Sequence, residues 1–195
     1  MKKLLMLALA LAALTACSAH TIVVADVDLL SLSGETAGLA GDLTVSGNVQ
    51  VYVPDADDNL FTPDGGYLVD GLPTLEDLYG FGIDLVVEVE NTGSGPLTFT
   101  ADFRLSSVDD STNIYDGAED VSLASSSINL EPGESGSVEL SAVLERGDPN
   151  LALISDQGFR VGVSLAASGT TSVHYELTSF RVVAKQRPFD LIPPP

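Results

Sequence analysis

The chain has 195 residues and a formal net charge of −20, from 28 acidic against eight basic side chains. This charge argues against nucleic-acid binding, whose affinity rests on cationic groups that displace counterions, and against lying flat on an anionic membrane. One cysteine and two histidines allow no disulfide within the chain and give poor support for a zinc site.

The first element in chain order is an N-terminal targeting segment. Lys2 and Lys3 precede an apolar run over residues 4–14, which is too short to span a hydrocarbon core ~30 Å thick. The run ends in L-T-A-C at residues 14–17, which resembles the lipobox of bacterial lipoproteins. The resemblance implies cleavage before Cys17, a diacylglycerol on its thiol, and acylation of the new amino terminus, for instance by palmitate.

The lipobox predicts where the protein resides. Residues 1–16 are expected to leave as signal peptide and residues 17–21 to form a lipidated tether, giving a mature charge of −22 because Lys2 and Lys3 leave with the signal. Two or three acyl chains anchor stably, whereas one holds only marginally. We therefore expect attachment to the cell membrane or the outer membrane, facing the periplasm or the outside. Ser18 favours the outer membrane, since in Gram-negative lipoproteins an Asp at that position favours inner-membrane retention.

The mature chain has the alternation of β-strands. Residues 43–53 place apolar side chains or glycine at odd positions and polar ones or Tyr52 at even positions, which predicts a strand with one buried face. The pattern returns over 83–89 and 97–105, separated by the turn-rich segment N-T-G-S-G-P. This spacing predicts a β-hairpin over residues 82–105.

Further strands are predicted over 22–30, 126–130, 137–145, 159–166 and 172–185, with a turn at residues 131–134. The apolar parity changes within the last strand, which predicts a β-bulge near Ser179. Short helical turns are possible at 73–79 and 149–154. These elements predict an all-β fold, an antiparallel β-sandwich of immunoglobulin-like type, over a single domain from 22 to 187, followed by an extended Pro-rich tail at 188–195.

Residues 82–185 also resemble two families of binding or protective domains. The segments E-N-T-G-S-G and L-E-P-G-E-S are similar to those of immunoglobulin-like surface modules of bacteria. The segment V-E-V-E-N-T-G-S-G-P-L-T-F resembles the start of the water-stress domain of late-embryogenesis-abundant proteins, although Thr92 stands where that family commonly has proline. Neither resemblance implies a catalytic site.

One acidic segment has the spacing of a calcium loop. Asp55, Asp57 and Asn59 stand at alternate positions, as hard oxygen ligands do at the start of such loops. The match then fails, because Leu60 and Gly66 replace the expected glycine and glutamate. A looser calcium site that adds Asp58 and Asp64 is one hypothesis, and a solvated acidic loop is the other. A second acidic loop, with Asp109, Asp110, Asp116, Glu119 and Asp120, is the other candidate for weak calcium binding.

Catalytic signatures are sparse. A serine hydrolase often carries Gly-x-Ser-x-Gly, and residues 133–137 come nearest but end in Ser137. His174 lies opposite the apolar parity of its strand, which predicts a solvent-facing side chain. We therefore predict that the protein is not an enzyme and carries no resident cofactor, calcium aside.

The sequence predicts a lipid-anchored, non-catalytic structural or interaction module at the membrane surface, with an envelope protein as partner. The basic residues Arg181, Lys185 and Arg187 are one candidate contact, and local charge balance is the competing explanation for them. The alternative function is a ligand-binding lipoprotein that holds calcium or a small apolar molecule.

Overall fold

The computed structural model describes residues 23–28, 30, 38–55, 59–70, 78–154 and 158–186. The strands are β1 (Val23–Asp28), β2 (Ala40–Val53), β3 (Tyr67–Val69), β4 (Leu78–Asn91), β5 (Leu97–Ser107), β6 (Asp120–Leu130), β7 (Ser135–Glu145) and β8 (Phe159–Gln186). A 3-10 helix, η2, covers Pro149–Leu153. The strands pair antiparallel and form two facing layers, so the predicted all-β antiparallel sandwich is confirmed.

The 28-residue strand β8 belongs to both layers. Its first part, from Phe159 to Gly169, pairs with β5, which pairs in turn with β6. Its second part, from Val173 to Gln186, pairs with β4, which pairs in turn with β7. The other edge of β8 is covered in order by β3, β2 and β1. The strands predicted over 159–166 and 172–185 are therefore one continuous strand.

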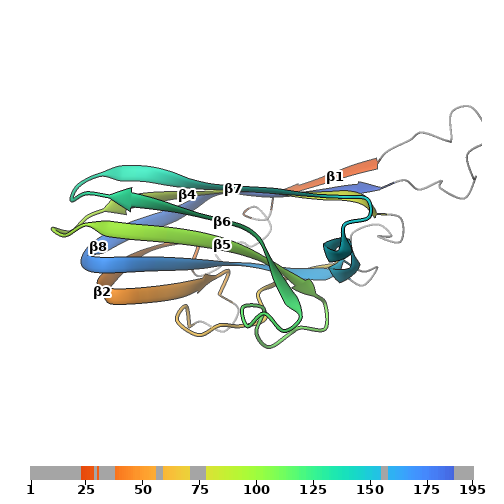
Figure 1. The fold of residues 1–195 in the computed structure, drawn as a ribbon, viewed down its shortest axis with the longest axis horizontal. Helices are drawn as coiled ribbons and strands as arrows, with labels where there is room; N and C mark the ends of the chain where they lie inside the picture. The colour runs from red at the N-terminus through yellow and green to blue at the C-terminus, as the bar shows by residue number, and fades with distance from the viewer. Residues whose placement is uncertain are drawn as a thin grey trace, which may run out of the picture.

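The hairpin predicted over residues 82–105 is wrong. The partners of β4 are β7 and β8, whereas those of β5 are β6 and β8, so the connection between them crosses from one layer to the other. The turn at residues 131–134 also crosses between the layers, from β6 to β7. Both crossings lie at the same end of the molecule as the bend in β8, on the left in Figure 1. We call this end the corner.

Buried Asn91 holds the corner together. Its Nδ2 donates to Gly95 O at 2.8 Å and to Leu130 O at 3.1 Å. Its Oδ1 accepts from Thr171 Oγ1 at 2.6 Å and from Gly93 N at 3.3 Å. All four hydrogen-bonding positions of the amide are therefore used. One side chain thus joins the β4–β5 crossing, the end of β6 and the bend in β8.

Glycines allow the chain to turn at the corner. Gly47 of β2 pairs with Gly169 of β8, and both have positive φ, 91° and 142°. Two neighbouring strands therefore bend at the same level, in a conformation that glycine adopts without strain. A Cβ at Gly93 would lie 2.4 Å from Ser172 N, so the β4–β5 crossing packs directly against the backbone of β8.

The core lies between the layers. Odd-numbered residues of β2, β4 and β5 point inward, as predicted for 43–53, 83–89 and 97–105. Ring contacts join the layers at Phe81–Phe159, Phe103–Phe180 and Phe99–Tyr175, with centroids 5.2, 5.8 and 6.5 Å apart. Burial of these large side chains is the main favourable contribution to folding.

Several local predictions can be compared with the structure. A register shift places Val86 opposite Ser179 and Val87 opposite Leu177, which confirms the β-bulge near Ser179. The turn predicted at 149–154 is η2, with Asp148 as its N-cap. Strand β3 was not predicted, because three residues are too few to show an alternation. Residues 1–22, 71–77 and 187–195, which hold the signal, Cys17, most of the turn at 73–79 and the tail, lie outside the described residues.

We predict that Asn91→Ala lowers the free energy of unfolding by at least about 3 kcal/mol, because several buried donors and acceptors at the corner lose their partner, each costing ~1–3 kcal/mol. Urea denaturation followed by circular dichroism measures this loss. Asn129→Ala is the control, since Asn129 is exposed and its side chain only accepts from Thr98 Oγ1 at 2.7 Å. Equal losses in the two variants would contradict the role given to Asn91.

Candidate binding surfaces

The described residues of the predicted calcium loop use their carboxylates to shape the loop. Asp55 Oδ1 accepts from Asn59 N at 3.0 Å, and Asp64 Oδ1 accepts from Gly66 N at 2.7 Å. Both aspartates are buried, whereas Asp57 lies outside the described residues. Within the described ranges, no group of three or more His, Cys, Asp or Glu side chains is placed to hold a metal ion. The described residues of this loop therefore provide no set of ligands for a calcium ion.

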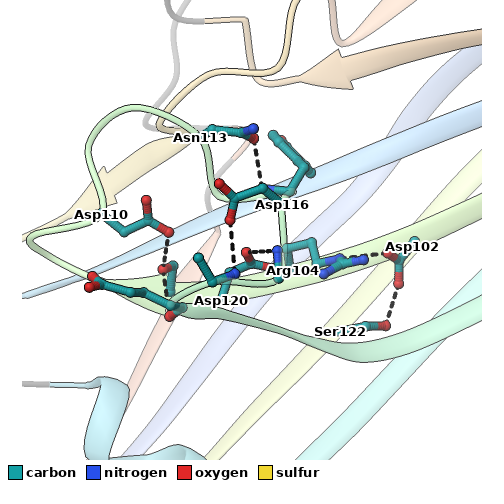
Figure 2. A network of polar contacts seen from close by, with 12 residues as sticks. Asp102, Arg104, Asp110, Asn113, Asp116, Asp120 and Ser122 are labelled. Atoms are coloured by element: carbon teal, nitrogen blue, oxygen red, sulfur yellow. Dashed lines mark hydrogen bonds and ion pairs between the residues drawn. The ribbon is translucent and has the colours of Figure 1, made fainter.

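The second acidic loop, between β5 and β6, is also folded on its own carboxylates (Figure 2). Ser106 Oγ lies 2.6 Å from Asp110 Oδ2, and Asp120 Oδ2 accepts from Gly117 N at 2.6 Å. Asp116 Oδ1 accepts from the N–H two residues further along, at 2.8 Å. The carboxylates of Asp110, Asp116 and Asp120 thus accept hydrogen bonds from backbone N–H groups or a hydroxyl in or beside the loop.

Arg104 is the only cation in this network (Figure 2). Its Nη1 lies 2.6 Å from Asp120 Oδ1 and its Nε 2.7 Å from Asp102 Oδ2. The Asp120 side chain is 0% exposed, and Ser122 Oγ donates a further hydrogen bond to Asp102. Burial alone would lower the pKa of the Arg104 guanidinium, but the hydrogen bonds and charges of the two aspartates outweigh it and raise the pKa. Arg104 therefore fastens β5 to β6.

The predicted basic contact is partly neutralised within the protein. Arg181, on the outer face of β8, binds Asp26 of β1 through Nε at 3.2 Å and through a second hydrogen bond from Nη2. That hydrogen bond and the charge of Asp26 raise the pKa of Arg181. Lys185 is exposed on the same face, and Arg187 lies outside the described residues. Arg181 thus matches the charge-balance explanation, while Lys185 remains a candidate contact.

A groove runs along the outer face of β4, beside Lys185. Alternate residues of a strand point outward, and at Gly80 and Gly82 the outward positions of β4 carry no side chain. Gly82 pairs with Val143 of β7 on one side and with Val183 of β8 on the other, so two apolar side chains flank the gap. The groove encloses about 460 Å³. Val143 is 65% exposed and stands at the side of the groove.

Sequence reasoning missed this groove. The segment L-Y-G-F-G-I contains its signal, because glycines alternate there with residues of the buried parity. That pattern becomes a groove only when two neighbouring strands supply the flanking side chains.

His174 faces solvent, as predicted. Its Nδ1 lies 2.9 Å from Asp42 Oδ1 across the β2–β8 pair, with 42% of the histidine and 83% of the aspartate side chain exposed. The pair stands open on the outer face of the sheet.

Two tyrosines are held in unusual surroundings. The Tyr115 ring lies 4.6 Å from that of Tyr52, and its hydroxyl oxygen is buried without a hydrogen-bond partner. Burial, aided by the charge of Asp64, raises the pKa of Tyr115. Tyr175 donates to Gly38 O at 3.1 Å, and burial, aided by the charge of Asp55, raises its pKa to about 12.

Comparisons with known proteins identify no family. No family model and no curated protein matches the chain. Among solved structures, a chain of infectious bursal disease virus, Gx strain, has a TM-score of 0.46 at 12% identity over 87% of this chain and 33% of the viral chain. The CBM22-1–GH10 modules of xylanase 10B from Clostridium thermocellum have a TM-score of 0.31 at 13% identity, over 75% of this chain and 26% of the xylanase chain. PirA has a TM-score of 0.30 at 13% identity, over 78% of this chain and 98% of the PirA chain. The protein thus spans about a third of the viral chain that it matches.

Among the described residues, no helix has the length and hydrophobicity needed to cross a membrane.

We predict that Arg104→Met lowers the free energy of unfolding by about 3 kcal/mol, because it leaves the buried Asp120 carboxylate without its counter-charge. Thermal and urea denaturation measure the loss. Arg181→Met is the control, since it removes an exposed ion pair, and such pairs contribute little. The role of Arg104 would be refuted by a loss no larger than that of the control.

We also predict that stability falls as the pH rises from about 10 to about 12. The Tyr175 hydroxyl ionises near pH 10 in the unfolded chain but has a folded pKa of about 12, so its contribution is complete below pH 10 and is lost through that window. Tyr115 acts in the same direction.

Urea denaturation at several pH values tests this, with Tyr175→Phe as the comparison. The variant loses the hydrogen bond to Gly38 at every pH, so only the pH dependence is informative. Its stability should fall less steeply above pH 10 than that of the natural protein, and parallel curves would contradict the assignment.

Proposed function

We propose that the protein is a lipid-anchored, non-catalytic structural or interaction module at the surface of a bacterial envelope membrane, where it contacts another envelope protein. The observation that carries the interaction is the groove over Gly80 and Gly82 with its exposed Val143. The L-T-A-C segment at 14–17 supports the anchor.

The groove lies at the end of the sandwich nearest the proposed anchor. Strand β1 begins at Val23, which pairs with Gln186 of β8, and the preceding residue of β8, Lys185, lines the groove. Six peptide steps separate Cys17 from Val23 and can span at most roughly 20 Å. A lipid on Cys17 would therefore hold the groove close to the membrane surface.

The groove has the make-up of a contact surface for a protein. Val143 and Val183 provide apolar area at its centre, and Asp84, Glu145, Arg146 and Lys185 provide charges of both signs around it. Protein interfaces commonly combine an apolar centre with a polar rim in this way. The partner we expect is an envelope protein that presents an apolar side chain between charged ones.

The anchor is tested by Cys17→Ser. We predict that the natural protein incorporates a fatty-acid probe and sediments with membranes, whereas the variant incorporates none and keeps its signal peptide. Labelling of the variant, or absence of labelling in both, would overturn the anchor. The stability of the domain is not expected to change, so circular dichroism provides the control.

The interaction is tested by brief cross-linking in cells, gentle solubilisation and mass spectrometry of what is captured. A stoichiometric protein partner should be lost from Val143→Arg and retained by Ser137→Arg, which places the same charge on the same face of β7 outside the groove. Recovery of the natural protein alone, or equal capture by both variants, would count against the groove.

A further inference from the structure

The outer face of the other layer carries a patch without charge. Strand register aligns its outward residues in two rows across β6, β5, β8 and β2. One row is Asn129, Thr98, Ser168 and Asn48, and the next is Ser127, Thr100, Ala166 and Gln50. All eight are exposed or half-buried. We call these eight residues the neutral face.

The neutral face contrasts with the outer face of β4. The chain carries 28 acidic residues, yet none falls among these eight positions. The outward positions of β4 in the opposite layer include Asp84, Glu88 and Glu90. Seven of the eight side chains on the neutral face end in hydroxyl or amide groups, which both donate and accept hydrogen bonds.

A shallow groove runs along the neutral face over β8. Ala166 and Ser168 form its floor, and longer side chains of β5 and β2 form its sides. These are Thr98 and Thr100 on one side and Asn48 and Gln50 on the other. The groove encloses about 460 Å³ and is lined by two successive outward positions on each of the three neighbouring strands β2, β8 and β5.

An aromatic pair stands in line with the groove. Tyr52 follows Gln50 by two residues on β2 and pairs with Ser164 of β8. It is therefore the next outward-facing residue along β2 after Asn48 and Gln50. Its ring contacts that of Tyr115 at 4.6 Å. A Cβ on Gly162 would lie 2.2 Å from the Tyr115 hydroxyl, which therefore covers β8 on this same outer face. That hydroxyl oxygen is buried and lacks a hydrogen-bond partner.

The chemistry of the neutral face selects one class of ligand. A nucleic acid or an anionic membrane requires cations, and calcium requires carboxylates or carbonyls arranged around one point. The centre of a protein interface is apolar and rich in aromatic residues, unlike these rows of Ser, Thr, Asn and Gln. A neutral sugar polymer offers many hydroxyls in a repeating line, and its C–H faces pack on aromatic rings.

We propose that the neutral face binds an uncharged polysaccharide, which lies along β8 between Thr98 and Thr100 on one side and Asn48 and Gln50 on the other. Thr98 and Ser168 adjoin the corner, since Gly169 pairs with the first residue of β5. About 13 residues of β8, or roughly 40 Å of strand, separate the corner from the end where β1 begins. The site therefore goes beyond the proposed protein contact, on a different face and toward the opposite end.

Affinity electrophoresis tests the proposal with the full chain in detergent micelles, since the charge of −20 ensures migration. The gels contain hydroxyethyl cellulose, laminarin, galactomannan or soluble starch, with polygalacturonate as an anionic comparison. We expect at least one neutral polymer to retard the protein and polygalacturonate to have no effect. Ala166→Arg, which fills the floor of the groove, should lower the affinity for that polymer at least tenfold.

Two further variants keep the test decisive. Ser137→Arg adds the same charge to the opposite layer and should bind as the natural protein does. Thr100→Ala combined with Gln50→Ala removes two hydrogen-bonding side chains without adding bulk, and should lower the affinity severalfold even if Ala166→Arg fails to fold. The proposal is overturned if none of the four neutral polymers retards the protein. It is also overturned if polygalacturonate retards it equally, or if the neutral-face variants that fold bind like the natural protein.

Discussion

The buried amide of Asn91 is the interaction on which the architecture depends. Three segments far apart in the chain change layers at one end of the sandwich, namely the β4–β5 crossing, the β6–β7 crossing and the bend in β8. Backbone that leaves a sheet gives up its ladder partners, and each buried group without a partner is costly. The Asn91 side chain is hydrogen-bonded to all three segments, through Gly95 O, Leu130 O and Thr171 Oγ1.

The shared strand β8 turns this corner into a single structure. Because β8 pairs with β5 in one layer and with β4 in the other, a single strand connects the two layers. The aromatic contacts across the core then hold the layers face to face, at Phe81–Phe159 and Phe103–Phe180. A sandwich built in this way presents two different outer faces at a fixed orientation to each other.

The distribution of charge follows from the same framework. In the acidic loops at Asp55, Asp64 and Asp110–Asp120, carboxylates accept hydrogen bonds from backbone N–H groups or hydroxyls, or pair with Arg104. These carboxylates therefore stabilise the conformation of the loops. Outside these loops the layers differ. The layer of β4 and β7 carries charged positions around an apolar groove, whereas that of β5 and β6 carries uncharged hydroxyls and amides at its corner end. The two proposed contacts rest on this difference.

The sequence by itself determined most of the strands, their buried parity and the bulge near Ser179, because alternation and a change of parity are local properties of one strand. The lipobox-like segment L-T-A-C at 14–17 is likewise a local pattern, and the lipid anchor that it indicates stays a prediction. Only the tertiary structure decided that N-T-G-S-G-P crosses between layers, since a turn-rich segment suits a hairpin and an interlayer crossing equally well. It also decided that Arg181 binds Asp26, that Gly80 and Gly82 form a groove, and that eight uncharged residues gather on one face. Each of these features depends on which strands pair and in what register. Strand pairing brings together residues that are far apart in the chain, and a local sequence pattern contains no information about such partners.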